Sequence, residues 1–182
     1  KWGQRTLAFE TAFQTLMFSD PIICLTGGMA SGPVDSPEAA AALYRRQVLE
    51  HGRQPRGAGR LEGLAQRAQV NNALCGDRVA VSLRLDGAGR IGEIRHDSQG
   101  CLLCLASASL MAGRIAGLDA AGVAREREAL VALLRHPDAA GDTGELAALA
   151  GAAPYPSRHR CVLLPWEALV DALQAPGTEP SP

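Results

Sequence analysis

NNALCGDRVAVSLRLDGAGRIGEIRHDSQGCLLCLASASLM, which runs from Asn71 to Met111, is the segment around which this chain is organised. It opens with a Cys-Gly-Asp sequence at residues 75–77 and passes through two strand-like runs. It closes with Gly100 and Cys101 at the head of a helical pattern rich in small residues. A third relevant thiol, Cys161, arrives much later in RHRCVLLPW. Three cysteines and an aspartate on different elements are what a thiolate-rich metal or sulfur site needs.

An antiparallel pair of strands is expected inside this segment. Apolar residues occupy every second position from Val79 to Leu85, which is the pattern of a half-buried strand. The Asp-Gly-Ala-Gly sequence at residues 86–89 favours a hairpin turn, and residues 90–97 return as the partner strand. Asp77 precedes the first strand and Cys101 follows the second, so both are expected at the same end of the sheet.

The rest of the chain predicts mostly helices. Residues 36–38 combine a capping serine, a proline and an acid, which predict the start of an amphipathic helix that ends near Gly52. Residues 65–72 predict a short strand, Asp119 is expected to cap a helix, and Pro165 is expected to shorten or bend the last helix. Helices are expected over residues 100–117, 119–136 and 154–174, with a loop and a short helix over 138–151. The predicted fold is α+β, with a small antiparallel three-stranded sheet packed on several helices.

Length and composition predict one domain with two extensions. The 182 residues are 47% hydrophobic, enough to bury a core, and we expect residues 38–174 to form the domain. Residues 1–37 are expected to be an N-terminal extension that is poorly ordered or not native, and residues 175–182 a disordered tail. Because Met29 begins a plausible start, we expect the first 28 residues to precede the native start or to dock poorly. Cys24 lies there and is given no role.

Charge and cysteine content exclude several classes of partner. The formal net charge is −1, so the chain offers no basic face for nucleic acid. The apolar run near the N-terminus is interrupted at Asp20 and Pro21 and is too short to span a membrane. It also lacks the features of a secretory signal. The five cysteines do not form a disulfide framework, which favours a cytoplasmic protein with free or metal-bound thiols.

Four side chains are candidate metal ligands. Cys75, Asp77, Cys101 and Cys161 would complete a four-coordinate shell of three thiolates and one carboxylate around zinc. A hard carboxylate among soft thiolates indicates a site built for ligand exchange. Spacing alone does not establish the site, because no pair has the usual zinc-ligand C-x-x-C form. Unrelated buried cysteines are the alternative.

The one literal C-x-x-C sequence is formed by Cys101 and Cys104. On a helix the two thiols lie on one face, which suits a redox dithiol, a metal pair or a simple core position. We favour the core position for Cys104, because a buried free cysteine commonly behaves as a small apolar residue.

The sequence resembles the iron–sulfur cluster assembly family that includes IscU, the N-terminal domain of NifU, and SufU. The resemblance is carried by LYRRQVLEHGRQPRGAG, NNALCGD, QGCLLCLASASLM, GDTGELAALAG and PSRHRCVLLPWEAL, which occur in order over residues 40–173. The chain is more similar to SufU than to IscU. The segment before Cys161 carries an insertion like that of SufU, and Arg160 stands where IscU has a histidine. The resemblance implies a fold like that of SufE, NifU and IscU.

The resemblance to SufU implies a function and a set of residues. It implies zinc held by Cys75, Asp77, Cys101 and Cys161, and persulfide sulfur received on Cys75 from a cysteine desulfurase of the SufS type. One zinc–thiolate bond would be exchanged for a partner's ligand to free Cys75, and Arg158 would support the site. A downstream cluster scaffold would be the next partner. The protein would then be a sulfurtransferase-like partner of the desulfurase rather than a stand-alone enzyme.

Two rival functions use the same cysteines. An IscU-like scaffold would assemble a [2Fe–2S] cluster, or bind iron, on Cys75, Cys101 and Cys161. A purely structural zinc domain would have no effect on any desulfurase. His159 lies one position too early to match the IscU histidine, so we expect a surface or supporting role for it, and we expect His96 to lie in the core or on a strand face.

Overall fold

An antiparallel sheet forms one layer of the protein, with its strands in the order β3-β2-β1-β4. The structure is a computed structural model that describes residues 46–138 and 141–179. The predicted extension over residues 1–37 and the predicted helix start at residues 36–38 lie outside the described residues. Three strands are those expected from the sequence, and they are β1 (Ala65–Asn72), β2 (Asp77–Leu85) and β3 (Ile91–Gln99).

A fourth strand lies at the edge of this sheet. Gly177–Thr178 form β4, which pairs with the start of β1 at Ala65 and Gln66. The composition of residues 175–182 predicts a disordered tail, whereas this part of it adds a short strand. The backbone groups at the free edge of β1 explain the difference, because an edge strand offers unpaired N–H and C=O groups to any extended segment beside it.

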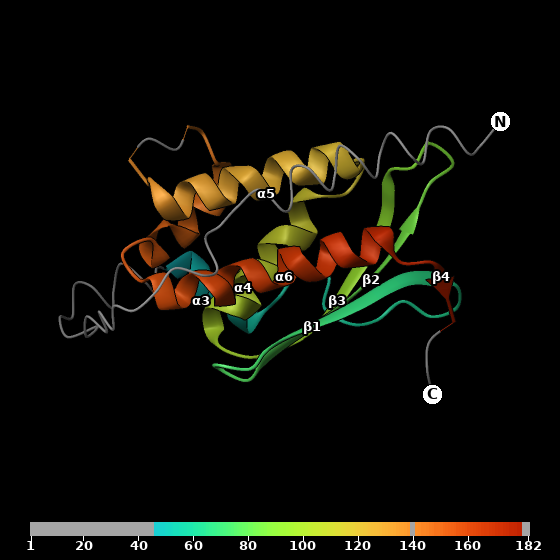
Figure 1. The fold of residues 1–182 in the computed structure, drawn as a ribbon, viewed down its shortest axis with the longest axis horizontal. Helices are drawn as coiled ribbons and strands as arrows, with labels where there is room; N and C mark the ends of the chain where they lie inside the picture. The colour runs from blue at the N-terminus through green and yellow to red at the C-terminus, as the bar shows by residue number, and fades with distance from the viewer. Residues whose placement is uncertain (1–45, 139–140, 180–182) are drawn as a thin grey trace. The chain divides into compact units, whose positions relative to one another are not determined.

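Helices cover one face of the sheet, as the α+β prediction requires. Helices α4 (Leu102–Arg114) and α6 (Pro156–Gln174) pack on the strands, and Figure 1 shows α6, in red, lying across them. Helix α5 (Ala120–Arg135) lies against α6 on the side away from the sheet (Figure 1). The remaining helices of the described residues are α3 (Arg46–Arg53), which packs on α4, and the 3₁₀ helix η2 (Gly144–Ala152).

The alternating pattern of β2 builds the core between these layers. Val79, Val81 and Leu83 point toward the helices and are buried, while the residues between them point to the opposite face. Their partners are the apolar residues of α4 and α6, including the fully buried Trp166. Asp119 caps α5 by accepting a hydrogen bond from the backbone N–H of Gly122 at 2.8 Å, as predicted.

Helix α6 continues without interruption through Pro165 to Gln174, so this proline does not shorten it. Pro165 and the neighbouring Trp166 are both buried, so packing holds this part of α6 although proline lacks an N–H group. Ser107 of α4 joins the two helices: its hydroxyl donates to the carbonyl of Val162 at 2.6 Å and accepts from Trp166 Nε1 at 3.2 Å.

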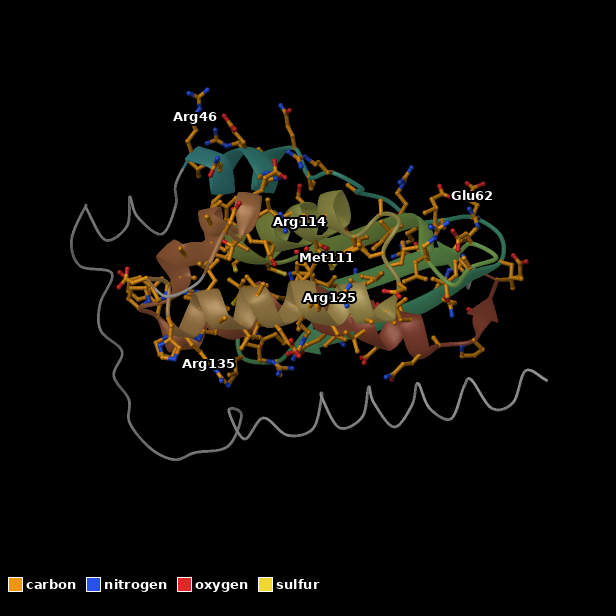
Figure 2. The ribbon with its side chains drawn as sticks, turned by 90° about the horizontal axis from the view of Figure 1, so that it is seen from above. Arg46, Glu62, Met111, Arg114, Arg125 and Arg135 are labelled. Carbon is orange, nitrogen blue, oxygen red and sulfur yellow. The ribbon has the colours of Figure 1, made fainter. Side chains whose placement is uncertain are left out.

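Helices α4 and α5 are also joined at their exposed sides. Figure 2 views the molecule from above and labels Arg125 and Arg135 on α5, with Arg114 and Met111 on α4. The Arg114 guanidinium forms an ion pair with Glu126 of α5 at 2.8 Å, and Met111 is fully buried in the core. In the part of the chain that the structure describes, no helix is long and apolar enough to cross a membrane.

Candidate metal centre

The candidate ligands come from three separate parts of the fold. Cys75 lies in the turn between β1 and β2, and Asp77 is the first residue of β2. Cys101 is the N-cap residue of α4, immediately after β3. Cys161 lies in α6. The antiparallel register pairs Asn72 with Asp77, which brings the turn and the start of α4 to the same end of the sheet.

The Cys-Gly-Asp turn has a defined backbone. Gly76 has a φ of +74°, in the left-handed region that a residue without a Cβ adopts easily. Its N–H donates to the carbonyl of Asn72 at 2.8 Å, and the N–H of Leu74 donates to Asn72 Oδ1 at 3.2 Å. Asn72 is itself buried, so the turn is anchored to the sheet and holds Cys75 in one place.

Three donor groups meet at this end of the sheet. One ligand atom each from Cys75, Asp77 and Cys161 lies within 4.8 Å of the other two. The Sγ atoms of Cys75 and Cys161 are 3.6 Å apart, too far for a disulfide bond. Two thiolates bound at about 2.3 Å to one tetrahedral zinc ion are separated by about 3.8 Å, so the observed spacing suits a shared ion.

The carboxylate of Asp77 is buried and only partly satisfied. Its Oδ1 accepts a hydrogen bond from the backbone N–H of Cys101 at 2.8 Å. Its Oδ2 has no hydrogen-bond partner of ordinary geometry among the described residues, although the residue is only 1% exposed. Buried polar atoms are normally paired, so an unpaired oxygen on a carboxylate that lies beside two thiols fits a ligand position.

The surroundings of Asp77 favour its charged form. Burial by itself raises the pKa of the carboxyl group, but the nearby Cys75 thiol and the hydrogen bond from the Cys101 N–H outweigh that effect. The pKa of Asp77 therefore lies below its usual value. A charged carboxylate is the form that binds a dication.

Cys101 lies beside this group and does not belong to the set of three atoms within 4.8 Å. Its thiol pKa is lowered to about 7, chiefly by the neighbouring Cys161 thiol. The N–H groups of Cys104 and Leu103, at the start of α4, lower it further. The neighbouring Cys101 thiol and burial raise the pKa of Cys161. Of these two thiols, Cys101 therefore loses its proton more readily.

Gly100 is a functional position that the sequence reasoning missed. A Cβ placed on Gly100 would lie 2.4 Å from Asp77 Oδ1 and 2.6 Å from its carboxyl carbon. The absence of a side chain therefore allows the carboxylate to reach the N–H of Cys101. The glycine directly before Cys101 was the available signal, since glycine in an extended segment marks a close approach by another group.

The other predicted residues lie around the centre. Cys104 is fully buried in the core, where burial raises its thiol pKa, in agreement with its predicted core position. Arg158 lies one helical turn before Cys161 and is half-buried, and its guanidinium forms no hydrogen bond or ion pair with another described residue. His159 donates through Nε2 to the carbonyl of Ala153 at 3.0 Å.

His96 lies in the core, as predicted, and its ring is fully hydrogen-bonded. Nε2 donates to the carbonyl of Arg56 at 2.9 Å, and Nδ1 accepts from the Ser98 hydroxyl at 2.9 Å. Since a carbonyl can only accept, Nε2 carries a proton, and burial lowers the pKa of His96, which favours the neutral ring.

The chain is similar to known proteins over most of its length. Residues 43–162 match the model of the NifU-like N terminal domain. The "Zinc-dependent sulfurtransferase SufU" of Bacillus subtilis is 31% identical over 129 residues, which cover 70% of this chain and 86% of that protein. The "Iron-sulfur cluster assembly scaffold protein IscU" of Streptococcus pyogenes is 32% identical over 135 residues, covering 72% of this chain and 83% of that protein.

A solved structure supports the same relationship. The N-terminal NifU-like protein of Brucella abortus has a TM-score of 0.67 to this chain at 27% identity. The match covers 75% of this chain and 95% of that one. The sheet covered by helices and the matched Cys-Gly-Asp region agree with the α+β, NifU-like fold expected from the sequence. The chain belongs to the NifU-like N-terminal domain family of iron–sulfur cluster assembly proteins.

Proposed function

We propose that this protein is a zinc-dependent sulfur acceptor of iron–sulfur cluster biogenesis, with Cys75 as the residue that receives sulfur. The observation that carries the proposal is the uneven burial of the three grouped donors. Asp77 and Cys161 are each 1% exposed, whereas Cys75 is exposed at the tip of a turn. A site in which one grouped donor is exposed and the other two are buried can retain a metal and still present the exposed thiol to another protein.

The donor set suits zinc. Cys75, Asp77 and Cys161, with Cys101 as the fourth ligand, would provide three thiolates and one carboxylate. When bound, zinc would hold the thiolates deprotonated and limit their reactivity until one of them is released. The unpaired Oδ2 of Asp77 and the 3.6 Å spacing of Cys75 and Cys161 support this assignment.

Sulfur transfer to Cys75 requires no net oxidation. The Cys75 thiolate attacks the outer sulfur of a persulfide on the donor's cysteine and forms a new S–S bond. The bond between the donor's two sulfur atoms breaks, and the donor cysteine leaves as a thiolate. Arg158, one turn before Cys161 and without an ion-pair partner among the described residues, supplies positive charge near the sulfur atoms.

A cysteine desulfurase of the SufS type is the proposed donor, and a downstream cluster scaffold is the proposed recipient. The similarity to the zinc-dependent sulfurtransferase of Bacillus subtilis supports this choice. In this role the protein acts as a partner of the desulfurase rather than as a stand-alone enzyme.

The test is alanine release from cysteine by the desulfurase of the same genome, with and without the zinc-loaded full chain. We expect the wild type to stimulate release and Cys75→Ser to abolish stimulation, because a hydroxyl cannot accept the sulfur. Cys104→Ala is the matched control, since Cys104 is a buried core thiol and its removal should leave stimulation in place. Full stimulation by Cys75→Ser would show that another residue accepts the sulfur. No stimulation by the wild type would favour a structural zinc domain.

A second candidate is an IscU-like scaffold that assembles a [2Fe–2S] cluster on Cys75, Cys101 and Cys161. The similarity to the Streptococcus pyogenes scaffold protein supports it. Anaerobic isolation separates the two functions: a brown, iron-containing protein favours the scaffold, and a colourless protein with zinc favours the sulfur acceptor. Asp77→Ala is informative as well, because it should weaken zinc binding in an acceptor and retain the cluster in a scaffold.

A further inference from the structure

Leu74, the residue before Cys75, has the most exposed large hydrophobic side chain in the described part of the chain. It is 94% exposed, compared with 62% for Leu64 and 38% for Leu85. Single exposed apolar residues are common on protein surfaces and need no explanation. The position of Leu74 is different, because it projects from the same turn as the only exposed thiol among the described residues.

The turn presents Leu74 in a fixed position. Its backbone N–H is bonded to Asn72 Oδ1, and the next turn bond, from Gly76 N–H to the Asn72 carbonyl, closes the loop. Asn72 is 3% exposed and pairs with Asp77 in the sheet. A residue whose backbone is already held loses less conformational entropy on binding than a residue in a mobile loop. Leu74 is therefore suited to binding another protein. Because its side chain is exposed, it adds no burial energy to the stability of this fold.

We propose that Leu74 is a docking anchor that inserts into an apolar pocket of the cysteine desulfurase and thereby aligns Cys75 with the donor's persulfide. This inference rests on the sulfur-acceptor function proposed above. The leucine and the thiol are adjacent residues of one anchored turn, so seating the first fixes the position of the second. Attack on a persulfide needs the two sulfur atoms in contact and in line, and such positioning is what an anchor provides.

Charges beside the turn indicate the chemistry of the pocket's rim. Arg78, three residues after Cys75, is half-buried on the outer face of β2, and Arg158 lies on α6 near Cys161. Neither forms an ion pair with another residue in the described ranges, unlike Arg84 and Arg160, which pair with glutamates. We therefore expect an apolar pocket whose rim carries acidic side chains. Such a rim increases the association rate more than the final affinity.

The experiment compares Leu74→Ala with Leu64→Ala in the zinc-loaded full chain. Leu64 and Leu74 flank opposite ends of β1, so the control removes the same atoms from an exposed leucine far from Cys75. Binding to the desulfurase of the same genome is measured by titration calorimetry, and stimulation by alanine release over a range of acceptor concentrations.

We expect Leu74→Ala to weaken binding and to raise the half-saturating concentration by about tenfold or more, with maximal stimulation retained. Leu74→Met should keep the wild-type binding affinity and half-saturating concentration, because methionine is also a large apolar residue. Leu64→Ala should change neither quantity. Zinc content should be normal in all variants. Equal binding by Leu74→Ala and wild type, with normal sulfur transfer, would overturn the anchor and leave the proposed function intact. A wild type that neither binds nor stimulates the desulfurase would overturn both.

Discussion

Asp77 uses its two carboxylate oxygens differently. Oδ1 is bound to the N–H of Cys101 and ties β2 to the start of α4. Oδ2 is buried without an ordinary partner, on a carboxylate that lies beside the thiols of Cys75 and Cys161. One side chain therefore has a structural contact that persists without a metal and a second oxygen available as a ligand. The small size of Gly100 is what permits the first contact.

Gly100→Ala tests this dependence on space at a single residue. The added Cβ would lie 2.4 Å from Asp77 Oδ1, so the carboxylate must move away from Cys101 and from the other ligands. We expect zinc affinity to fall at least tenfold and the free energy of unfolding to fall by about 1–3 kcal/mol, the usual cost of overpacking. Metal titration with a chromogenic chelator and urea unfolding measure the two effects.

Gly87→Ala is the control for that substitution. Gly87 lies in the β2–β3 turn, has no positive φ, and a Cβ there meets nothing within 4 Å. It should bind zinc like the wild type. Normal zinc affinity in Gly100→Ala would mean that the Asp77 carboxylate is not held by the contact with Cys101.

At the scale of elements, His96 connects β3 to the segment over residues 56–64 that crosses the outer face of the sheet. Beside the ring contact with Arg56, the backbone of His96 exchanges hydrogen bonds with Gly57 and Gly59 at 2.9 Å. Farther along, the N–H of Leu61 donates to the Ser82 hydroxyl at 3.0 Å. These contacts hold an irregular segment against the sheet and cover the outer edge of β3.

This connection predicts that stability falls in mild acid. Burial lowers the pKa of His96 below its usual value of 6.5, and the hydrogen bond to Arg56 and the charge of Asp97 only partly oppose that shift. A lowered folded-state pKa means that the unfolded chain binds the proton more readily. The free energy of unfolding is therefore highest above pH 6.5 and decreases as the pH falls, by up to about 1.4 kcal/mol per pH unit.

Urea unfolding between pH 7.5 and 5 of wild type and His96→Phe measures this contribution. His51, whose pKa is lowered chiefly by burial, adds a similar slope to both proteins. The difference between the two curves isolates His96, and we expect the variant to depend less on pH. Parallel curves would show that His96 titrates alike in the folded and unfolded chain.

At the scale of the whole molecule, the candidate centre joins elements that are distant in sequence. Cys75 and Cys161 are 86 positions apart and belong to the sheet and to the last helix. A metal bound between them would cross-link the two layers of the fold. Its binding free energy would therefore add to the stability of the entire domain.

Metal removal is thus expected to destabilise the protein globally. At a free zinc concentration of 100 times Kd the stabilisation is about 2.7 kcal/mol, which corresponds to a decrease in Tm of about 5–10 °C after chelation. Differential scanning calorimetry with and without EDTA measures the change. Cys104→Ala should show the same decrease, whereas Cys161→Ser should unfold alike in both conditions. A wild-type Tm that does not respond to EDTA or to added zinc would contradict a resident metal.

Much of the fold follows from local sequence patterns. The alternation from Val79 to Leu85, the Asp-Gly turn and the Asp119 cap each depend on neighbours only a few residues away, so they identified elements that the structure confirms. Two features depend on distant parts of the chain and do not follow from such patterns. Strand β4 exists because β1 has a free edge, and α6 continues to Gln174 through Pro165, which is buried in the fold.

The candidate metal centre was likewise predicted from the sequence only in part. The residue types and their order along the chain, with the family resemblance they carry, were enough to name Cys75, Asp77, Cys101 and Cys161, although the complete four-ligand shell stays a prediction. Only the folded chain brings the thiols of Cys75 and Cys161 within 3.6 Å, buries Asp77 beneath Gly100 and leaves Leu74 in solvent. These contacts join residues from separate elements, and their distances depend on how the sheet and helices pack rather than on any local pattern.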